Sequence, residues 1–244
     1  MKLEGKIGII TGGGQGIGKA IASRLAADGE TVVIADLENS SGAKTADELK
    51  TAGFKALFIP TDVTNSSEVE LLMKKTCENF GEISTLVTCA GIIPPIMPFE
   101  DIPEELFDKV LAVNLKGTFL CIKSAIPYLK QKRSGSIICI ASRAGFRVGM
   151  KNVSYGSSKA AVVMLAQHAA KELAEFGIRV NILAPGLTEV GSIDNVVRKH
   201  LESTLLLGSL VNPDEIATAA SMLASDDFPH MTGGVFSIDG GQNL

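Results

Sequence analysis

Two tyrosines of the chain each precede a lysine by four positions, and this spacing suits acid–base chemistry. The pairs are Tyr128 with Lys132 and Tyr155 with Lys159. Side chains four residues apart share one face of a helix, so the lysine ammonium can stand beside the phenol. At about 5 Å and an effective dielectric of about 20, that charge contributes roughly 3 kcal/mol and would lower a phenol pKa near 10 to about 8. Such a tyrosine can exchange a proton with an alcohol or a carbonyl near neutral pH.

A glycine-rich segment near the N-terminus offers a binding site for a pyrophosphate. It lies between a predicted strand over 7–11 and a predicted helix over 16–28. Where side chains are absent, backbone amides at the start of a helix can approach an anion closely. The residues expected to contact the phosphates are Gly12, Gln15, Gly16, Ile17 and Gly18.

Asp36 ends the second predicted strand, eighteen residues beyond Gly18. A carboxylate there can accept hydrogen bonds from both ribose hydroxyls of an adenosine and would repel a 2′-phosphate. Gln15 and Leu37 add no cation that could bind such a phosphate. The pattern predicts NAD rather than NADP as the cofactor, with a solvated strand end as the alternative role for Asp36.

Short β-branched runs alternate with amphipathic stretches along the whole chain, which predicts an α/β fold. Repeated strand–helix–strand units favour one seven-stranded parallel sheet with helices on both faces, in a single domain spanning 1–244. The predicted strands are 7–11, 31–36, 55–60, 85–89, 136–141, 179–183 and 235–238. The predicted helices are 16–28, 41–52, 66–80, 103–131 and 153–176.

These elements distinguish the two tyrosines. Crossover helices run antiparallel to the strands, so Tyr128, near the end of the helix over 103–131, is expected at the amino edge of the sheet. Tyr155 begins the next helix and is expected at the carboxyl edge, where the glycine-rich segment also lies. Ser142 directly follows the strand over 136–141, and its hydroxyl can hydrogen-bond a substrate oxygen. Asn114 lies mid-helix, where asparagine is unfavourable, so we expect it to have a specific polar partner.

Composition excludes several classes of protein. The 244 residues are 45% hydrophobic and 20% charged, with a net charge of -4, which excludes disorder and disfavours nucleic-acid binding. The longest uninterrupted apolar run, 160–166, is far shorter than the roughly 18 residues of a membrane span. The first residues carry charges where an export signal is apolar, so we expect a cytoplasmic protein. Four cysteines and three histidines are too scattered to predict a metal site.

The order Ser142, Tyr155 and Lys159, together with the spacing of the glycines, resembles the short-chain dehydrogenase/reductase family over nearly the whole chain. The members that it resembles are NAD-dependent alcohol dehydrogenases and 3-oxoacyl-carrier-protein reductases. The resemblance implies a Rossmann fold, Tyr155 as general acid/base and Ser142 as the residue that polarises the substrate oxygen. It also implies that Lys159 binds the nicotinamide ribose and that Asn114 holds a water in a proton relay toward Lys159.

The resemblance extends to other cofactor contacts, with two departures from the family pattern. The implied contacts are Asp62, Val63, Cys89, Ala90, Gly91, Pro185, Gly186 and Thr188. Cys89 stands where the family usually has asparagine, so support of the central strand is expected to differ. Val190 stands where the family usually has threonine, and Thr188 is the alternative hydroxyl.

Apolar loop residues predict a secondary alcohol or ketone of modest size as substrate. The candidate substrate contacts are Ile93, Arg143, Phe146, Met150 and Leu187. Arg143, Arg147 and Lys151 recur every four residues and suit either an anionic substrate or a solvated cationic edge. The irregular region 187–211, with a short helix over 195–206, is interpreted as a substrate-binding lid or a surface excursion. By resemblance, the ending 232–241 packs between subunits, which implies a homotetramer.

Other functions remain open at this point. A 3-oxoacyl-carrier-protein reductase would dock its acidic partner on basic residues; Arg133 matches one such position, whereas Phe176 occupies the other. Such reductases usually prefer NADPH, which Asp36 disfavours. A non-catalytic NAD-binding regulatory protein is an alternative of a different class, although it would have no need of Ser142, Tyr155 and Lys159. A lyase or epimerase that uses NAD only transiently is a further possibility.

Overall fold

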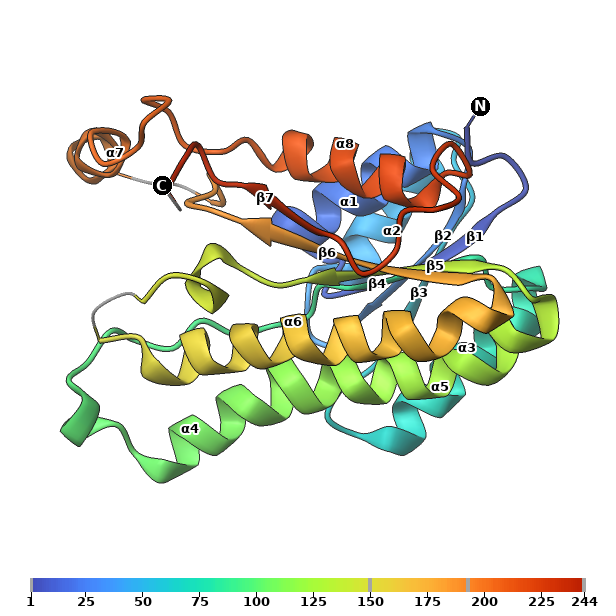
Figure 1. Ribbon diagram of the computed structural model, residues 1–244. Helices are drawn as coiled ribbons and strands as arrows, with labels where there is room; N and C mark the ends of the chain where they lie inside the picture. The colour runs from blue at the N-terminus through green and yellow to red at the C-terminus, as the bar shows by residue number, and fades with distance from the viewer. Residues whose placement is uncertain (1, 149–150, 192–193, 243–244) are drawn as a thin grey trace.

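Seven parallel strands form one sheet in the order β3-β2-β1-β4-β5-β6-β7 (Figure 1). The computed structural model describes residues 2–148, 151–191 and 194–242. The strands are β1 (Ile7–Thr11), β2 (Thr31–Asp36), β3 (Ala56–Pro60), β4 (Thr85–Thr88), β5 (Gly135–Ile140), β6 (Ile178–Pro185) and β7 (Val235–Ile238). The predicted α/β fold with a seven-stranded parallel sheet is confirmed.

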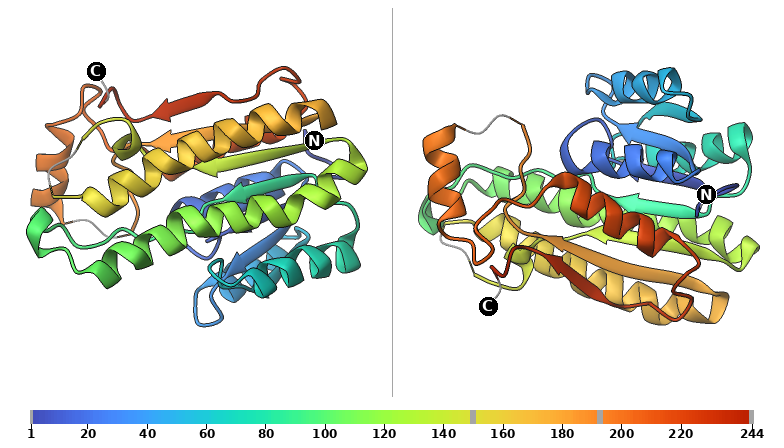
Figure 2. Two further views of the ribbon diagram at one scale, coloured as in Figure 1. Left: turned by 60° about the horizontal axis from the view of Figure 1, so that its bottom comes forward. Right: turned by 90° about the horizontal axis from the view of Figure 1, so that it is seen from above.

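Helices cover both faces of this sheet (Figure 1). One face carries α1 (Gly16–Ala27), α2 (Gly42–Thr51) and α8 (Pro213–Ala224). The other carries α3 (Ser66–Phe80), α4 (Glu104–Leu111), α5 (Gly117–Lys132) and α6 (Val153–Leu173). The short helix α7 (Asn195–Glu202) stands apart from both layers, beyond the end toward which the strand arrows point (Figures 1 and 2).

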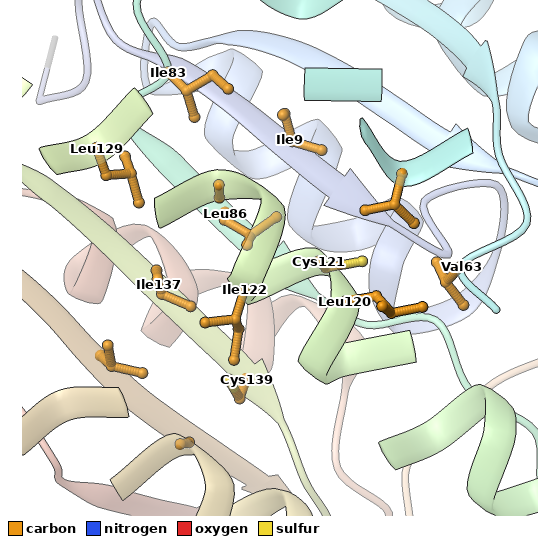
Figure 3. Packing of buried hydrophobic residues seen from close by; sticks show 14 of the residues in the cluster. Ile9, Val63, Ile83, Leu86, Leu120, Cys121, Ile122, Leu129, Ile137 and Cys139 are labelled. Atoms are coloured by element: carbon orange, nitrogen blue, oxygen red, sulfur yellow. The ribbon is translucent and has the colours of Figure 1, made fainter. Parts of the chain in front are cut away.

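Side chains alternate along each strand between two hydrophobic clusters. Ile9 of β1 faces the cluster formed with α3, α5 and α6, whereas its neighbour Ile10 faces the cluster formed with α1, α2 and α8. Figure 3 shows Ile122 of α5 among buried residues of the sheet that include Leu86 and Ile137. Because both faces are buried, most strand residues are apolar and polar residues do not alternate regularly along the strands.

Helix α8 was absent from the sequence-based prediction. Its start carries a capping box: the side chain of Asn212 accepts a hydrogen bond from Asp214 N, and the side chain of Glu215 accepts one from Asn212 N. Pro213 occupies the first turn, where proline is favourable. This start signal is visible in the sequence. The helix packs against α1, where Arg24 donates a hydrogen bond to Thr218 at 2.8 Å.

The predicted helix over 103–131 is divided in the structure. Helix α4 and helix α5 are joined by a π-helical turn, Ala112–Lys116, that contains Asn114. Within the described residues, Glu104–Lys132 is the one helical stretch long and apolar enough to cross a membrane, with a mean hydropathy of 1.3. Charged residues such as Lys109, Lys116 and Lys123 interrupt this stretch, so it contains no long uninterrupted apolar run. Its apolar side chains are partly buried in the core, including Leu120 and Leu129, which accounts for its composition (Figure 3).

Other boundaries differ by a few residues. Helix α6 gives way to a 3₁₀ turn, Ala174–Phe176, before the predicted end at 176. Strand β6 extends beyond the predicted 179–183 as far as Pro185, because Ala184 and Pro185 pair with β7. Helix α7 ends at Glu202 rather than 206.

Glu30 is a buried carboxyl group at the amino end of β2, 2% exposed, and neither of its oxygens has a hydrogen-bond partner among the described residues. A Cβ atom on Gly8 would lie 2.7 Å from its Cδ, so the glycine makes room for the carboxyl. Burial raises the pKa of Glu30 to about 7, and the nearby Thr85, Lys6 and Lys132 oppose that effect only in part.

We expect Glu30 to make the stability of the protein depend on pH. Its folded-state pKa of about 7 exceeds the ordinary value of 4.5, so the folded protein retains a proton that the unfolded chain loses. Stability therefore falls as pH rises from about 4.5 to 7, by up to about 3 kcal/mol. The Glu30→Gln variant should gain stability relative to the wild type at pH 8 and not at pH 4.5, as measured by urea unfolding. Glu70→Gln, at an exposed position, is the control. Parallel pH profiles of wild type and Glu30→Gln would contradict this account.

Candidate active site

The glycine loop between β1 and α1 is shaped for an anion. Gln15, the N-cap of α1, makes no side-chain hydrogen bond to the first turn, so no side chain occupies the amides there. A Cβ atom on Gly18 would overlap the carbonyl group of Gly12, and one on Gly12 would lie 2.8 Å from Cα of Ala90. The glycines therefore allow a tight turn and close contact with the loop after β4. This loop and the start of α1 fit a dinucleotide pyrophosphate.

Asp36 is held in place at the carboxyl end of β2 by two backbone amides. Its Oδ2 accepts a hydrogen bond from Gly14 N at 2.9 Å, and its Oδ1 accepts one from Leu37 N at 2.8 Å. The hydroxyl of Thr45 in α2 donates to the carbonyl of Gly14 at 3.0 Å, so α2 also supports the glycine loop. The carboxylate is thus oriented beside the glycine loop, as expected for a ribose anchor.

Two of the implied cofactor contacts, Asp62 and Val63, follow β3. Oδ1 of Asp62 accepts hydrogen bonds from the amide and the hydroxyl of Thr64, both at 2.8 Å, which fixes this turn. Val63 is 7% exposed and lies against α5, where a Cβ atom on Gly117 would be 2.7 Å from it. Both side chains are therefore engaged with the protein and define the shape of the loop.

The loop after β4 is supported by a backbone interaction. The hydroxyl oxygen of Thr11 accepts hydrogen bonds from Cys89 N at 3.1 Å and Ala90 N at 3.2 Å. Cysteine supplies the same amide as asparagine would, so this support does not depend on the side chain at position 89. Burial raises the pKa of the Cys89 thiol to about 11, which keeps the thiol protonated near neutral pH.

Asn114 is completely buried, and its predicted polar partners are confirmed. Its Oδ1 accepts a hydrogen bond from Ile92 N at 2.8 Å, and its Nδ2 donates to Ile92 O and to Ser158 Oγ, both at 3.1 Å. Ser158 Oγ in turn donates to the carbonyl of Tyr155 at 2.7 Å. Asn114 thereby connects the loop after β4 with helix α6. The sequence analysis does not predict a role for Ser158, which directly precedes Lys159 in α6.

Lys159 lies in the interior, 5% exposed. Its Nζ donates a hydrogen bond to the carbonyl of Ile140 at 2.8 Å and lies 5.9 Å from the ring centroid of Tyr155. A Cβ atom on Gly91 would lie 3.6 Å from this Nζ and 3.2 Å from Oδ1 of Asn114. The three residues therefore meet at the carboxyl edge. Burial lowers the pKa of Lys159.

The hydroxyl of Ser142 lies close to the phenol of Tyr155. Burial raises the pKa of Tyr155, and the hydrogen bond with Ser142 lowers it by a smaller amount. The expected lowering of this pKa by Lys159 is therefore wrong for this structure. The ammonium binds the Ile140 carbonyl, and removal of the phenol from water has the larger effect. Ser142 Oγ accepts a hydrogen bond from Ala144 N at 3.1 Å, so its own proton remains available to donate.

Gly145 sets the distance between the Ser142 turn and helix α6. A Cβ atom there would lie 2.8 Å from the carbonyl carbon of Lys159 and 2.9 Å from Ala160 N. Only glycine permits this contact without displacing one of the two segments. Gly145 was not predicted to serve the site, although a glycine three residues after Ser142 was a visible signal of close approach.

The loop after β6 departs from the expected arrangement. The hydroxyl of Thr188 donates to the carbonyl of Gly186 at 3.0 Å, so its donor is used within its own loop. Val190 instead faces the glycine loop, where a Cβ atom on Gly16 would lie 3.4 Å from its side chain. Pro185 ends β6, and Gly186 N donates to Ile238 O at 2.9 Å, which holds this loop against the end of β7.

The candidate substrate residues lie on loops at the carboxyl edge. Ile93 and Phe146 are exposed apolar side chains, 72% and 49% accessible, and Arg143 and Leu187 are partly buried. Met150 lies outside the described residues. In the part of the chain that the structure describes, no three His, Cys, Asp or Glu side chains are grouped as metal ligands.

The second tyrosine–lysine pair lies at the opposite edge, as predicted. Nζ of Lys132 donates to Ser84 Oγ at 2.7 Å, and Ser84 immediately precedes β4. Tyr128 lies one turn earlier on α5 and packs against the core cluster. This pair is therefore separated from the glycine loop by the length of the sheet.

Comparisons with known proteins show the family of this chain. The model of a family described as Enoyl-(Acyl carrier protein) reductase matches residues 12–243. The 2,5-dichloro-2,5-cyclohexadiene-1,4-diol dehydrogenase LinX of Sphingobium indicum is 40% identical over 246 residues, covering 100% of this chain and 98% of the relative. The cis-4-hydroxycyclohexanecarboxylate dehydrogenase of Sinomonas cyclohexanicum is 35% identical over 240 residues, covering 97% of this chain and 96% of the relative.

A solved structure shows the same architecture. The crystal structure of a short-chain type dehydrogenase/reductase from Mycobacterium marinum superposes with a TM-score of 0.93 at 33% sequence identity. The match covers 100% of this chain and 97% of that chain. The family match, the identities over nearly complete chains and the shared sheet lead to one conclusion: this chain belongs to the short-chain dehydrogenase/reductase family of oxidoreductases.

Proposed function

We propose that this protein is an NAD(H)-dependent oxidoreductase that transfers a hydride between the nicotinamide and a secondary alcohol or ketone. The observation that carries the proposal is the grouping of Ser142 and Tyr155 beside the buried Lys159. These residues share the carboxyl edge of the sheet with the glycine loop. Members of this family use nicotinamide cofactors, so the position of the pair suits hydride transfer.

Each side chain of the site would have its own role in the reaction. The nicotinamide, when bound, accepts or supplies the hydride. Tyr155 is the general acid or base that gives a proton to a carbonyl oxygen or takes one from an alcohol. The hydroxyl of Ser142 donates a hydrogen bond to the reacting oxygen and polarises it. Lys159 keeps a positive charge in the site and binds the nicotinamide ribose, and Asn114 holds a water in a proton relay toward Lys159.

Asp36 supports NAD rather than NADP. Its carboxylate is fixed by the amides of Gly14 and Leu37, so a 2′-phosphate at this position would meet a negative charge that cannot turn away easily. The same oxygens can accept the hydroxyls of an unphosphorylated ribose.

The apolar side chains around the site favour a substrate with an apolar body. LinX is named for a cyclic diol and the Sinomonas enzyme for a hydroxylated cyclohexanecarboxylate. We therefore propose a ring-bearing secondary alcohol of modest size, with 187–211 as the lid over it. Arg143 would then be the cation nearest to Ser142 along the chain for a substrate that also carries a carboxylate.

Reduction of a 3-oxoacyl-carrier-protein is the second candidate, and one contact favours it. Nζ of Lys130 lies 3.7 Å from the ring centroid of Phe176. A cation therefore covers position 176, where this chain has phenylalanine instead of a basic docking residue. Arg133 is nearby and donates to the carbonyl of Glu175 at 3.0 Å. The carboxylate of Asp36 still disfavours the NADPH that such reductases usually prefer.

We also propose a homotetramer in the cytoplasm. The edge strand β7 is only partly buried, although Val235, Phe236 and Ile238 are apolar. A second copy of the chain would cover this edge, which otherwise exposes apolar side chains.

Tyr155→Phe should abolish turnover while cofactor binding remains. Loss of the phenolic proton should lower kcat by about 10²–10⁴ with ring alcohols and NAD, because the general acid/base is removed. NADH formation at 340 nm measures turnover, and NADH fluorescence measures binding. Tyr128→Phe is the matched control and should retain full activity, since it removes the same atom at the opposite edge. Turnover of Tyr155→Phe at near wild-type rate would refute the assignment.

A wild type that turns over only acyl thioesters would establish the second candidate, and one that binds NADH but turns over neither would indicate a regulatory protein.

Alcohol oxidation should rise with pH, because a raised pKa keeps the Tyr155 phenol protonated and oxidation requires the base form. Ser142→Ala removes a hydrogen bond that lowers this pKa, so the rise in kcat/KM should move to higher pH. Ser134→Ala, at an exposed position, is the control and should leave the profile in place. A profile that moves to lower pH in Ser142→Ala would show that the hydrogen bond acts in the opposite sense.

Asp36→Ala should weaken NAD binding and narrow the preference for NAD over NADP. The variant loses the ribose acceptor and the charge that repels a 2′-phosphate, so discrimination should fall by about tenfold or more. Dissociation constants for both reduced cofactors, measured by fluorescence titration, give the ratio. Asp47→Ala, on the exposed side of α2, is the control. An unchanged ratio in Asp36→Ala would contradict the role given to this carboxylate.

A further inference from the structure

The turn that follows β7 contacts two other segments beside the site. Gly240 and Gly241 adopt positive φ angles of 62° and 86°, which turn the chain back toward the end of β6. The carbonyl of Gly240 accepts a hydrogen bond from Leu207 N at 3.2 Å, and a Cβ atom on Gly241 would lie 2.9 Å from the side chain of Leu206. This turn therefore supports the far end of the 187–211 region.

Gln242 binds the near end of the same region. Its Oε1 accepts a hydrogen bond from Leu187 N at 3.0 Å. Its backbone carbonyl accepts one from Nη1 of Arg147 at 2.6 Å, in the segment that follows Ser142. One residue near the end of the chain thus links the loop after β5 with the loop after β6.

Leu187 is held from both sides. Gly186 N makes the last strand-like hydrogen bond to β7, with Ile238 O, and the next amide, Leu187 N, has the side chain of Gln242 as its partner. The carbonyl of Leu187 accepts a hydrogen bond from Val211 N at 2.9 Å, where the 187–211 region returns to the sheet. The Gln242 side chain therefore replaces a strand partner at the point where this region begins.

The close contact requires glycine at position 186. A Cβ atom there would lie 2.6 Å from Cα of Asp239 and 2.8 Å from Oε1 of Gln242. Oδ1 of Asp239 accepts a hydrogen bond from Gly241 N at 3.0 Å, which closes the turn that carries Gln242. The turn after β7 thus places the Gln242 carboxamide against the backbone of Gly186, which has no side chain to prevent the contact.

We propose that Gln242 is a positioning residue for the active site, acting through Leu187. Its carboxamide oxygen fixes the first residue of the 187–211 region, so that the loop after β6 keeps the geometry that cofactor and substrate need. The role rests on the proposed function, because Leu187 lies on the loop whose residues are candidate contacts of the cofactor and the substrate. Gln242 itself takes no part in proton or hydride transfer.

Three variants separate this role from a general structural one. Gln242→Leu removes the acceptor with little change in size, whereas Gln242→Glu keeps an oxygen that can accept the Leu187 amide. Gln131→Leu makes the same change at an exposed position on α5 and is the matched control. Hydrogen exchange of the Leu187 amide in the protein without added cofactor tests the contact and needs no activity. Steady-state kinetics then test its consequence.

In Gln242→Leu, the Leu187 amide should exchange about tenfold faster, and KM for NAD and for the alcohol should rise about tenfold, equivalent to about 1.4 kcal/mol. The kcat should stay within about twofold, and Gln242→Glu and Gln131→Leu should behave as the wild type. Unchanged exchange would overturn the proposal, as would faster exchange with unchanged KM or an equal defect in Gln242→Glu. If no substrate is found, NADH binding by fluorescence replaces KM, so failure of the proposed function is distinguished from failure of this inference.

Discussion

Parallel pairing of all seven strands is the constraint on which the site depends. It brings the carboxyl ends of β1, β2, β4, β5 and β6 to one edge, so that residues from distant parts of the sequence become neighbours. The glycine loop follows β1, Asp36 ends β2, and Ser142 follows β5. The crossover helices then start at this same edge, which places Tyr155 there and leaves Tyr128 at the other.

Glycines, which have no side chain, make the contacts between these loops possible. Gly12 permits contact between the loop after β1 and the loop after β4, and Gly145 permits contact between the Ser142 turn and helix α6. Gly186 does the same between the end of β6 and the turn after β7. At each place the backbone approaches more closely than a Cβ atom would allow. The glycines therefore determine the spacing between loops as well as the room for a pyrophosphate.

Burial governs the electrostatics of the site. Lys159 is buried and Tyr155 is partly buried, which disfavours the charged form of each. Protein hydrogen bonds compensate in part: the carbonyl of Ile140 receives the ammonium, and Ser142 contacts the phenol. Asn114, in its π-helical turn, binds the loop after β4 and, through Ser158, helix α6.

The sequence alone determined the sheet, most of the helices that cover it, the glycine loop after β1 and the placement of the two tyrosines at opposite edges of the sheet. These features follow from hydrophobic periodicity and from the direction of crossover helices, both of which are read from residues close together in the chain. The helix α8 was also encoded locally, in the capping residues Asn212 and Glu215, and was overlooked. Only the tertiary structure decided the direction of the pKa shift of Tyr155, the link from Asn114 to Ser158 and the contact of Gln242 with Leu187. The pKa shift depends on burial by the whole fold, and the two contacts join residues 44 and 55 positions apart. The local spacing of residues in the sequence carries no information about burial or about such distant contacts.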